Sequence, residues 1–133
     1  VVAVTLSGAL MEEVTVDASR CAAIPDELDF VCASIFPLVY GTVWHALVER
    51  GELKAGEKVL VLGAGGGIGQ AACELAKALG AQVVAAASSP EKLEAAIRAG
   101  ADATVAYPGE MDVDAQRSFG ASLKATVGAE GFD

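Results

Sequence analysis

The second half of the chain alternates short apolar runs with amphipathic stretches. The apolar runs, rich in Val, Leu and Ala and bounded by turn residues, lie at 59–62, 82–86 and 103–107. Their length and composition predict three buried strands. The longer stretches that follow them lie at about 68–79, 90–99 and 113–127. The pattern therefore predicts a strand followed by a helix, repeated three times.

Apolar residues recur at helical spacing in the stretches between the runs. In the first stretch they stand at i, i+3, i+4, i+7, i+8 and i+11, namely Ile68, Ala71, Ala72, Leu75, Ala76 and Leu79. The corresponding residues of the two later stretches are Leu93, Ala96 and Ile97, and then Phe119, Leu123 and Val127. Each stripe predicts a helix face that packs on the sheet, and Gly80 and Gly100 are the expected stops of the first two helices.

This order of elements predicts an α/β fold. Strands joined by single helices and short connections form right-handed crossovers, so the three strands form a parallel sheet ordered 3-2-1. In a complete doubly wound sheet the strand 59–62 has a neighbour on its far side. No later apolar run supplies that neighbour, and the sequence predicts part of a doubly wound sheet.

The first half of the chain has a less regular pattern. Residues 13–17 alternate as a half-buried strand does, and 21–24 form a short extended segment that closes in a turn at Pro25. Asp26 or Asp29 is expected to cap a brief helix. A longer helix is predicted from Pro37 to about Arg50, and its apolar residues on nearly every side predict that it is buried.

Composition supports the α/β assignment and excludes some partners. Apolar residues make up 53% of the chain and aromatic residues only 5%, which suits closely packed parallel strands and helices. The net charge of −9, without a Lys/Arg cluster, excludes a surface that follows nucleic-acid phosphates. No apolar run is seen that approaches the roughly 20 residues of a membrane span. We expect a cytoplasmic protein without nucleic-acid or membrane partners.

The three cysteines form neither a disulfide framework nor a metal cluster. Cys21, Cys32 and Cys73 are an odd set without a C-x-x-C pair and without a neighbouring histidine. The sequence predicts buried, reduced thiols.

A glycine-rich turn between the first predicted strand and its helix is the main candidate for chemistry. The sequence KVLVLG-AGGGIG-QAACELAKAL has Gly63, Gly66 and Gly69 at intervals of three, and the strict G-x-G-x-x-G spacing is met with Ala64 in the first place. Missing side chains permit a tight turn, close approach of the backbone to a pyrophosphate, and close packing of helix on strand. We predict a nucleotide-cofactor site, with a purely structural tight turn as the alternative.

The end of the second strand indicates which dinucleotide binds. An NAD site has Asp or Glu there, bonded to the ribose 2′-hydroxyl. This chain has Ala-Ala-Ser-Ser at 86–89, no carboxylate before Glu91, and a cation at Lys92 that can pair with a 2′-phosphate. NADPH is therefore favoured over NADH. The alternative, that the serines are helix caps and Lys92 is solvated, is compatible with this role.

The sequence contains no self-contained catalytic set. His45 is the only histidine, and its apolar neighbours favour a packed or hydrogen-bonded structural residue over a catalytic base. There is no Ser/His/Asp set, carboxylate pair or H-E-x-x-H motif. Catalytic residues remain unassigned, and any reaction is expected to be that of the cofactor.

Four stretches of the chain resemble, in order and spacing, the medium-chain dehydrogenase/reductase superfamily. They are FPLVYGTVWHAL, GELKAGEKVLVLGAGGGIGQAACELAKALGA, SSPEKLEAAIRAGAD and VGAEGFD. The resemblance is to its zinc-independent quinone oxidoreductase branch, which includes zeta-crystallin. It implies a fragment centred on a Rossmann domain. Residues 1–25 would be the end of a GroES-like catalytic domain, 26–56 the connecting helices, and 57–133 the first half of the NAD(P)-binding Rossmann domain.

The resemblance also implies roles for single residues. Thr42 falls where family members contact the nicotinamide, and the pyrophosphate turn comprises Gly63, Ala64, Gly66, Gly67, Ile68 and Gly69. Ser88, Lys92 and Tyr107 fall where NADPH-using members hold the 2′-phosphate, although Tyr107 can equally cap the sheet edge. Zinc-containing relatives have a cysteine ligand where this chain has Leu38, so no metal site is expected.

The resemblance implies an NADPH-dependent oxidoreductase that transfers hydride to a small-molecule quinone or an α,β-unsaturated carbonyl. Two alternatives remain open: part of an enoyl-thioester reductase, and an isolated dinucleotide-binding module without activity of its own. A homodimer is expected for the full-length protein.

Overall fold

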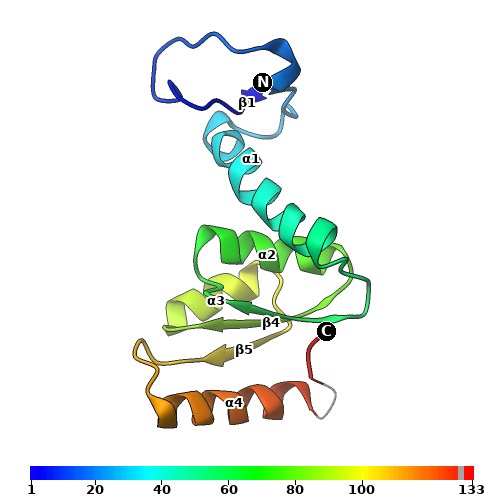
Figure 1. Cartoon of the computed structure of the whole chain (residues 1–133), viewed down its shortest axis with the longest axis vertical. Helices are drawn as coiled ribbons and strands as arrows, with labels where there is room; N and C mark the ends of the chain where they lie inside the picture. The colour runs from blue at the N-terminus through cyan, green and yellow to red at the C-terminus, as the bar shows by residue number, and fades with distance from the viewer. Residues whose placement is uncertain (129–130) are drawn as a thin grey trace.

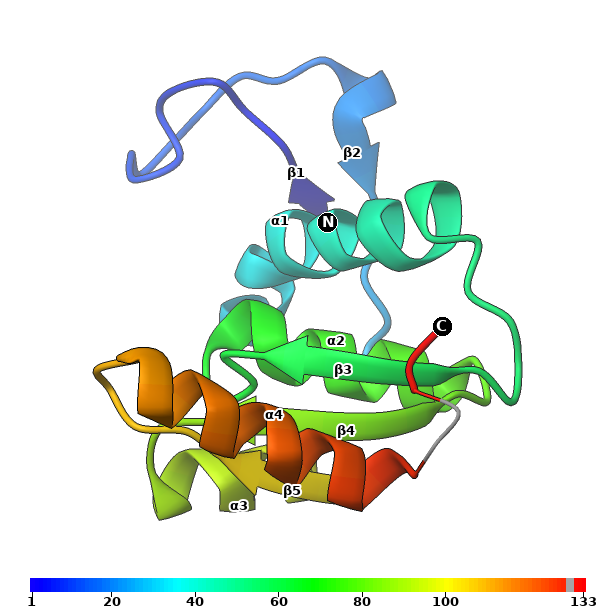
Figure 2. The same ribbon diagram turned by 60° about the horizontal axis from the view of Figure 1, so that its bottom comes forward.

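The structure, a computed structural model, describes residues 1–128 and 131–133. Its centre is a parallel sheet in the order β3-β4-β5, which confirms the predicted order. The strands are β3 (Lys58–Leu62), β4 (Gln82–Ala87) and β5 (Ala103–Ala106). The helices beside it are α2 (Gly67–Ala78), α3 (Pro90–Arg98) and α4 (Val113–Val127). Helices α2 and α3 lie on one face of the sheet, and α4 lies on the other (Figure 1 and Figure 2).

The middle strand carries the core. From Val83 to Ala87 every residue of β4 is buried, and α2 contributes Cys73 and Ala76 at zero exposure. Small side chains at these positions let helix and strand backbones approach closely. The burial of three large apolar residues is predicted wrongly: Leu62, Ile68 and Ile97 are 61%, 47% and 54% exposed. Leu62 ends β3, whose outer edge is unpaired in the described residues. Ile68 lies in the first turn of α2, beyond the end of β3, and Ile97 is rotated away from the sheet relative to the buried Ala96.

Asp133 and Asp102 make the same contact at the starts of two strands. The Asp133 N–H donates to the Lys58 carbonyl at 3.2 Å, and its carboxylate accepts from the Lys58 N–H at 2.9 Å. The Asp102 N–H donates to the Val83 carbonyl, and the Asp102 carboxylate accepts from the Val83 N–H, each at 2.8 Å. Strand β5 begins at the next residue. Within the described residues the sheet ends at β3, as the sequence predicts, and Asp133 covers only the start of that edge.

The carboxylate of Asp102 makes stability depend on pH. Its pKa is held below the ordinary 3.8, first by the hydrogen bond from the Lys77 ammonium and second by the Val83 N–H. A depressed pKa contributes stability above pH 3.8 that is lost as the pH falls through the lower folded-state value.

We expect Asp102→Asn to lower the free energy of unfolding, measured with urea at pH 7, by about 1 kcal/mol. The effect is small because the Lys77–Asp102 pair is partly exposed. The difference should shrink below pH 3.8. An equal loss of stability at pH 7 and below pH 3.8 would contradict the role of the ionised Asp102 carboxylate. Asp26→Asn, a substitution at an exposed position, is the control.

The N-terminal segment forms a small antiparallel sheet. Strand β1 (Val2–Ala3) pairs with β2 (Cys21–Ala22), and the short 3-10 helix η1 (Ala18–Arg20) precedes β2. The extended segment predicted near Cys21 is confirmed. The strand predicted at 13–17 is wrong, because these residues find no pairing partner in the described chain and lie mostly exposed. The predicted domain boundaries remain predictions.

The long helix α1 (Phe30–Trp44) joins the brief helix expected after Asp26 or Asp29 to the longer helix expected from Pro37. Asp29 caps it by accepting the Cys32 N–H at 2.8 Å. Pro37 therefore lies inside the helix rather than at its start. The helix continues as the π-helix η2 (His45–Arg50), and Gly51 ends it as expected by donating to the Ala46 carbonyl at 2.8 Å.

The expected burial of this helix is also wrong. Only Ala33 and Val43 are buried in α1. The large exposed apolar side chains are Phe30, Val31, Ile35, Phe36, Leu38 and Trp44. The continuous helix Phe30–Arg50 has 21 residues, and its most apolar window is 11% buried, so by length and composition it could cross a membrane, contrary to the sequence expectation. The core helix of a soluble protein passes the same test, so this is weak evidence for a span.

The cysteines differ in environment although all three are free thiols. Cys73 is buried, and desolvation, with Glu74 as a lesser cause, raises its pKa to about 11. Cys32 is exposed, and the charge of Asp29 raises its pKa. Cys21 is half-buried. The prediction of buried thiols is confirmed for Cys73 and wrong for Cys32.

Candidate cofactor-binding site

The glycine turn joins β3 to α2 in a conformation that needs glycine at its first position. Gly63 has φ +67°, in the left-handed region, and its carbonyl accepts from the Gly66 N–H at 3.1 Å. The Ala64 N–H donates to the Ala86 carbonyl at 3.1 Å, and Ala64 is fully buried. The turn is therefore anchored to the middle strand of the sheet.

Gly69 lets α2 start directly against this turn. A Cβ there would lie 2.4 Å from the Gly63 oxygen and 2.7 Å from the Ala64 Cα. Gly66 at the N-cap brings no side chain, so the first N–H groups of α2 point outward without a side-chain cap. Such a helix start has positive partial charge and donors aimed at one point, which suits an anion.

A groove of about 450 Å³ runs beside the turn. Its walls are the outer side of β3, the turn, the start of α2 and Leu47 of η2, namely Leu47, Val59, Leu60, Val61, Leu62, Gly63, Gly66, Gly67, Ile68, Gly69 and Ala72. The part of the groove at Leu62, Gly63 and Gly66 lies at the carboxyl end of β3, where ligands of doubly wound sheets bind, and the rest runs along the unpaired edge of β3. The exposure of Ile68, an error of the core prediction, follows from its place in this wall.

Lys92 lies against the turn from the neighbouring helix. The first turn of α3 packs so closely that a Cβ on Gly65 would lie 2.4 Å from the Lys92 Cβ. The Lys92 Nζ donates to the Ser88 Oγ at 3.4 Å. The backbone N–H of Lys92 donates to the Ser89 Oγ at 3.4 Å, so the capping interpretation also holds. Hydrogen bonding to Ser89 lowers the pKa of Glu91, which is a carboxylate in the same helical turn.

Tyr107 directly follows β5, at the carboxyl end of the sheet. Its N–H donates to the Ala87 carbonyl at 3.1 Å, and its ring packs edge-on against Phe119 with centroids 5.6 Å apart. The ring is half-buried. Its structural role as an aromatic cap is therefore visible, and its role at a 2′-phosphate stays a prediction.

Thr42 lies on α1, on an exposed part of the helix. Its hydroxyl donates to the Leu38 carbonyl at 2.6 Å, which leaves oxygen lone pairs free to accept. Leu47 follows five residues later on the same continuous helix and lines the groove. This places the helix of Thr42 beside the groove, although Thr42 itself does not line it.

The contact between α1 and α2 includes a hydrogen bond that sequence patterns do not reveal. The Tyr40 hydroxyl donates to the Glu74 carboxylate. This bond, and secondly desolvation, raises the pKa of Tyr40 to about 12, so the hydroxyl keeps its proton at neutral pH. The Phe36 ring stacks on the Tyr40 ring, with the ring centroids 4.4 Å apart. A pairing 34 residues apart has no periodic signal.

His45 is hydrogen-bonded, which is one of the two environments that the sequence favours, and it is not packed in the core. Its Nδ1 lies 2.6 Å from the Glu49 carboxylate, one helical turn away, and both side chains are more than half exposed. Among the described residues no three His, Cys, Asp or Glu side chains are grouped to hold a metal. Leu38 has an exposed hydrocarbon side chain.

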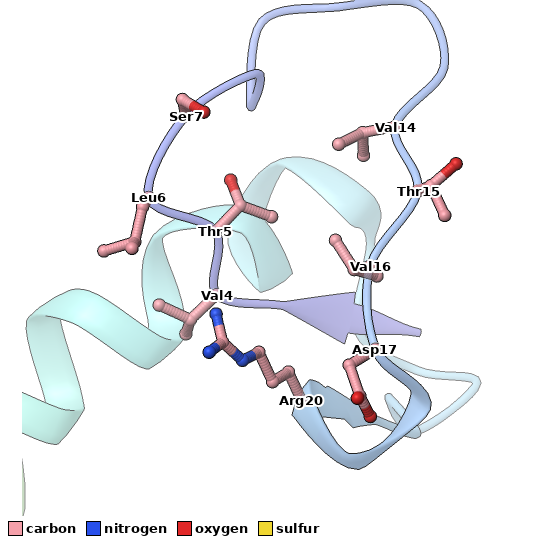
Figure 3. A pocket seen from close by; sticks show the side chains of 9 residues that line it. All are labelled: Val4, Thr5, Leu6, Ser7, Val14, Thr15, Val16, Asp17 and Arg20. Carbon is pink, nitrogen blue, oxygen red and sulfur yellow. The ribbon is translucent and has the colours of Figure 1, made fainter.

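A second hollow lies in the N-terminal loop (Figure 3), at the opposite end of α1 from the sheet (Figure 1). Its walls come from the segment between β1 and β2 and include Thr5, Asp17 and Arg20. The Thr5 hydroxyl is buried without a hydrogen-bond partner. The residues predicted for cofactor binding do not line this hollow.

Comparison with known families identifies the chain. Residues 67–133 match the family described as zinc-binding dehydrogenase. The chain belongs to this family. It is thus part of the medium-chain dehydrogenase/reductase superfamily, as the motifs from Phe36 onward predict.

Relatives of the chain include a polyketide synthase and a quinone oxidoreductase. It is 38% identical over 118 residues to highly reducing polyketide synthase 40 of Fusarium pseudograminearum, covering 89% of the chain and 4% of the synthase. It is 32% identical over 129 residues to the quinone oxidoreductase of Pongo abelii, covering 97% of the chain and 37% of that protein. The chain therefore spans little more than a third of one relative and a small part of the other.

Solved structures of related proteins have the same fold. A quinone oxidoreductase from Thermus thermophilus, solved also as its NADPH complex, has TM-score 0.74 and 38% identity over 78% of this chain and 35% of its own. The CurK enoyl reductase has a TM-score of 0.75 and is 29% identical, and the match covers 90% of this chain and 34% of CurK. An NAD-dependent alcohol dehydrogenase has a TM-score of 0.78 and is 34% identical, and the match covers 89% of this chain and 32% of the dehydrogenase.

Proposed function

We propose that this chain is the cofactor-binding region of an NADPH-dependent oxidoreductase of the quinone oxidoreductase type. The observation that carries the proposal is the place of Lys92. Its stem packs on the glycine turn at Gly65 and its ammonium reaches Ser88, where an NAD site has a carboxylate. The Thermus thermophilus relative, solved with NADPH, supports the same cofactor.

The residues of the chain divide the work of holding the dinucleotide. The N–H groups at Gly67 and Ile68 bind the pyrophosphate, with the positive end of α2 behind them. Ser88, Lys92 and Tyr107 hold the 2′-phosphate, and the Thr42 oxygen accepts a hydrogen bond from the nicotinamide end. When bound, the nicotinamide supplies hydride to an activated double bond or a quinone. The protein contributes orientation and exclusion of water.

A second candidate function is part of an enoyl-thioester reductase. The match to a highly reducing polyketide synthase and the likeness to the CurK enoyl reductase favour it. The two activities share the cofactor site and differ in the groove for the substrate. Assays of the complete parent polypeptide with a simple quinone and with an enoyl thioester discriminate them.

The whole activity is a proposal, because the chain covers little more than a third of its quinone oxidoreductase relative. The 133-residue chain alone is expected to bind the cofactor without turnover, as an isolated module does. The cytoplasmic location, the homodimer of the full-length protein and the absence of membrane and nucleic-acid partners remain predictions.

Calorimetric titration of the chain with NADPH and NADH tests the cofactor. We expect NADPH to bind at least about tenfold more tightly, the factor that one charge-assisted contact to the 2′-phosphate supplies. Equal affinity for the two nucleotides would contradict the argument from Lys92 while leaving a dinucleotide site. Binding of neither would overturn the proposal.

A further inference from the structure

The two ends of the proposed cofactor site lie on different elements. The pyrophosphate donors are at the start of α2, whereas Thr42 is on α1, which crosses α2 outside the sheet (Figure 1). A dinucleotide that contacts both must find them at a constant separation. Only Ala33 and Val43 of α1 are buried, so apolar packing alone holds this helix weakly.

One directional contact joins the two helices near these ends. The Tyr40 hydroxyl donates to the Glu74 carboxylate, and Tyr40 is two residues from Thr42. Glu74 is seven residues after Gly67, about two turns along α2. The stacked Phe36 ring holds the Tyr40 ring in one orientation. The bond therefore restrains sliding and rotation of α1 relative to α2, which apolar packing by small side chains does not.

We infer that Tyr40 and Glu74 are a positioning pair, which makes α1 and α2 respond as one unit when the dinucleotide binds. The inference rests on the proposed function. Neither residue contacts the cofactor in this arrangement. Without the bond, the turn would still bind the pyrophosphate and Lys92 the 2′-phosphate, but α1 would no longer be ordered by the bound nicotinamide end.

Amide hydrogen exchange of the 133-residue chain with and without saturating NADPH tests the pair. In the unsubstituted 133-residue chain we expect NADPH to slow amide exchange both in the glycine turn and in α1 around Thr42. Tyr40→Phe keeps the ring and its stack on Phe36 but loses the hydroxyl. We expect the protection of the turn to persist and the NADPH affinity to fall by no more than about tenfold, because binding and the ordering of α1 are coupled. The NADPH-dependent protection of α1 should fall by about threefold to tenfold, the factor that one hydrogen bond supplies.

Variants of the acceptor give an independent measurement. Glu74→Ala should reproduce the Tyr40→Phe result, and Glu74→Gln, whose amide oxygen still accepts the hydroxyl, should restore the protection. Glu94→Ala on α3, at another exposed helical glutamate, is the matched control and should change nothing. Circular dichroism of each variant checks that the helices are retained.

The outcomes separate this inference from the proposed function. NADPH binding with unchanged protection of α1 in both Tyr40→Phe and Glu74→Ala would overturn the positioning role alone. Equal loss of protection in α1 with and without NADPH would also overturn it, because that marks a structural contact only. Absence of NADPH binding by the parent chain would overturn the proposed function, and the positioning role with it.

Discussion

Gly69→Ala is expected to destabilise the chain by about 3 kcal/mol or more in urea unfolding followed by circular dichroism. The new Cβ would lie 2.4 Å from the Gly63 carbonyl oxygen and 2.7 Å from the Ala64 Cα. Both atoms belong to the backbone of the turn, so no side-chain rotation can relieve the contact. Helix α2 must move away from β3 or the turn must open, and either change exposes the core around Ala64 and Cys73.

Gly67→Ala is the matched control for this prediction. Gly67 lies two residues earlier in the same helix, and a Cβ there would meet nothing within 4 Å. Alanine also has the higher helix propensity, so this variant should be as stable as the parent or more stable. Equal destabilisation by both substitutions would show that loss of turn flexibility, and not the close approach at Gly69, is what the chain cannot tolerate.

Lys92→Ala is expected to weaken NADPH binding by about tenfold to one hundredfold and to leave NADH affinity within about twofold. The ammonium is placed to pair with the 2′-phosphate, the only group by which the two nucleotides differ. Because Lys92 is exposed, the preference of the parent chain for NADPH should also decline as salt is raised. Calorimetric titrations of both nucleotides at two ionic strengths measure both effects.

Lys124→Ala removes the same charge from α4 and controls for the change in net charge. It should leave both affinities unchanged. A Lys92→Ala variant that loses NADPH and NADH affinity equally would show that Lys92 supports the glycine turn through its packing on Gly65 and does not select the 2′-phosphate.

Periodic patterns predicted the sheet and its helices because each of these elements buries its own face. The stripe of α2, the stops at Gly80 and Gly100 and the range of α4 follow from spacing and local turn chemistry, and the structure has them. Ile68 and Ile97 were misplaced by the same rule. Spacing assigns a residue to a helix face, but it does not say where along that face the sheet ends, as at Ile68, or how the helix is rotated on the sheet, as at Ile97.

The errors in the first half of the chain have a different cause. The alternating residues 13–17 cannot form a strand without a partner strand, and the described chain does not supply one. Asp29 was an expected cap, but of a separate brief helix. In α1 that helix and the one expected from Pro37 are continuous, because a helix can contain a proline when its other bonds are kept. Its apolar composition indicated burial, but burial depends on what packs against a helix, and few described residues do.

For the candidate site, the sequence by itself determined the glycine turn, the missing carboxylate near Ala87 and the cation at Lys92. These depend on neighbouring residues, whose geometry local sequence dictates. Only the tertiary structure brought Lys92 against Gly65, Leu47 into the groove and Tyr40 onto Glu74. Such contacts join residues that are several helical turns or a whole strand apart in the sequence, and they form only when α1 and α3 dock beside the turn. Their positions follow from packing, which no periodicity encodes.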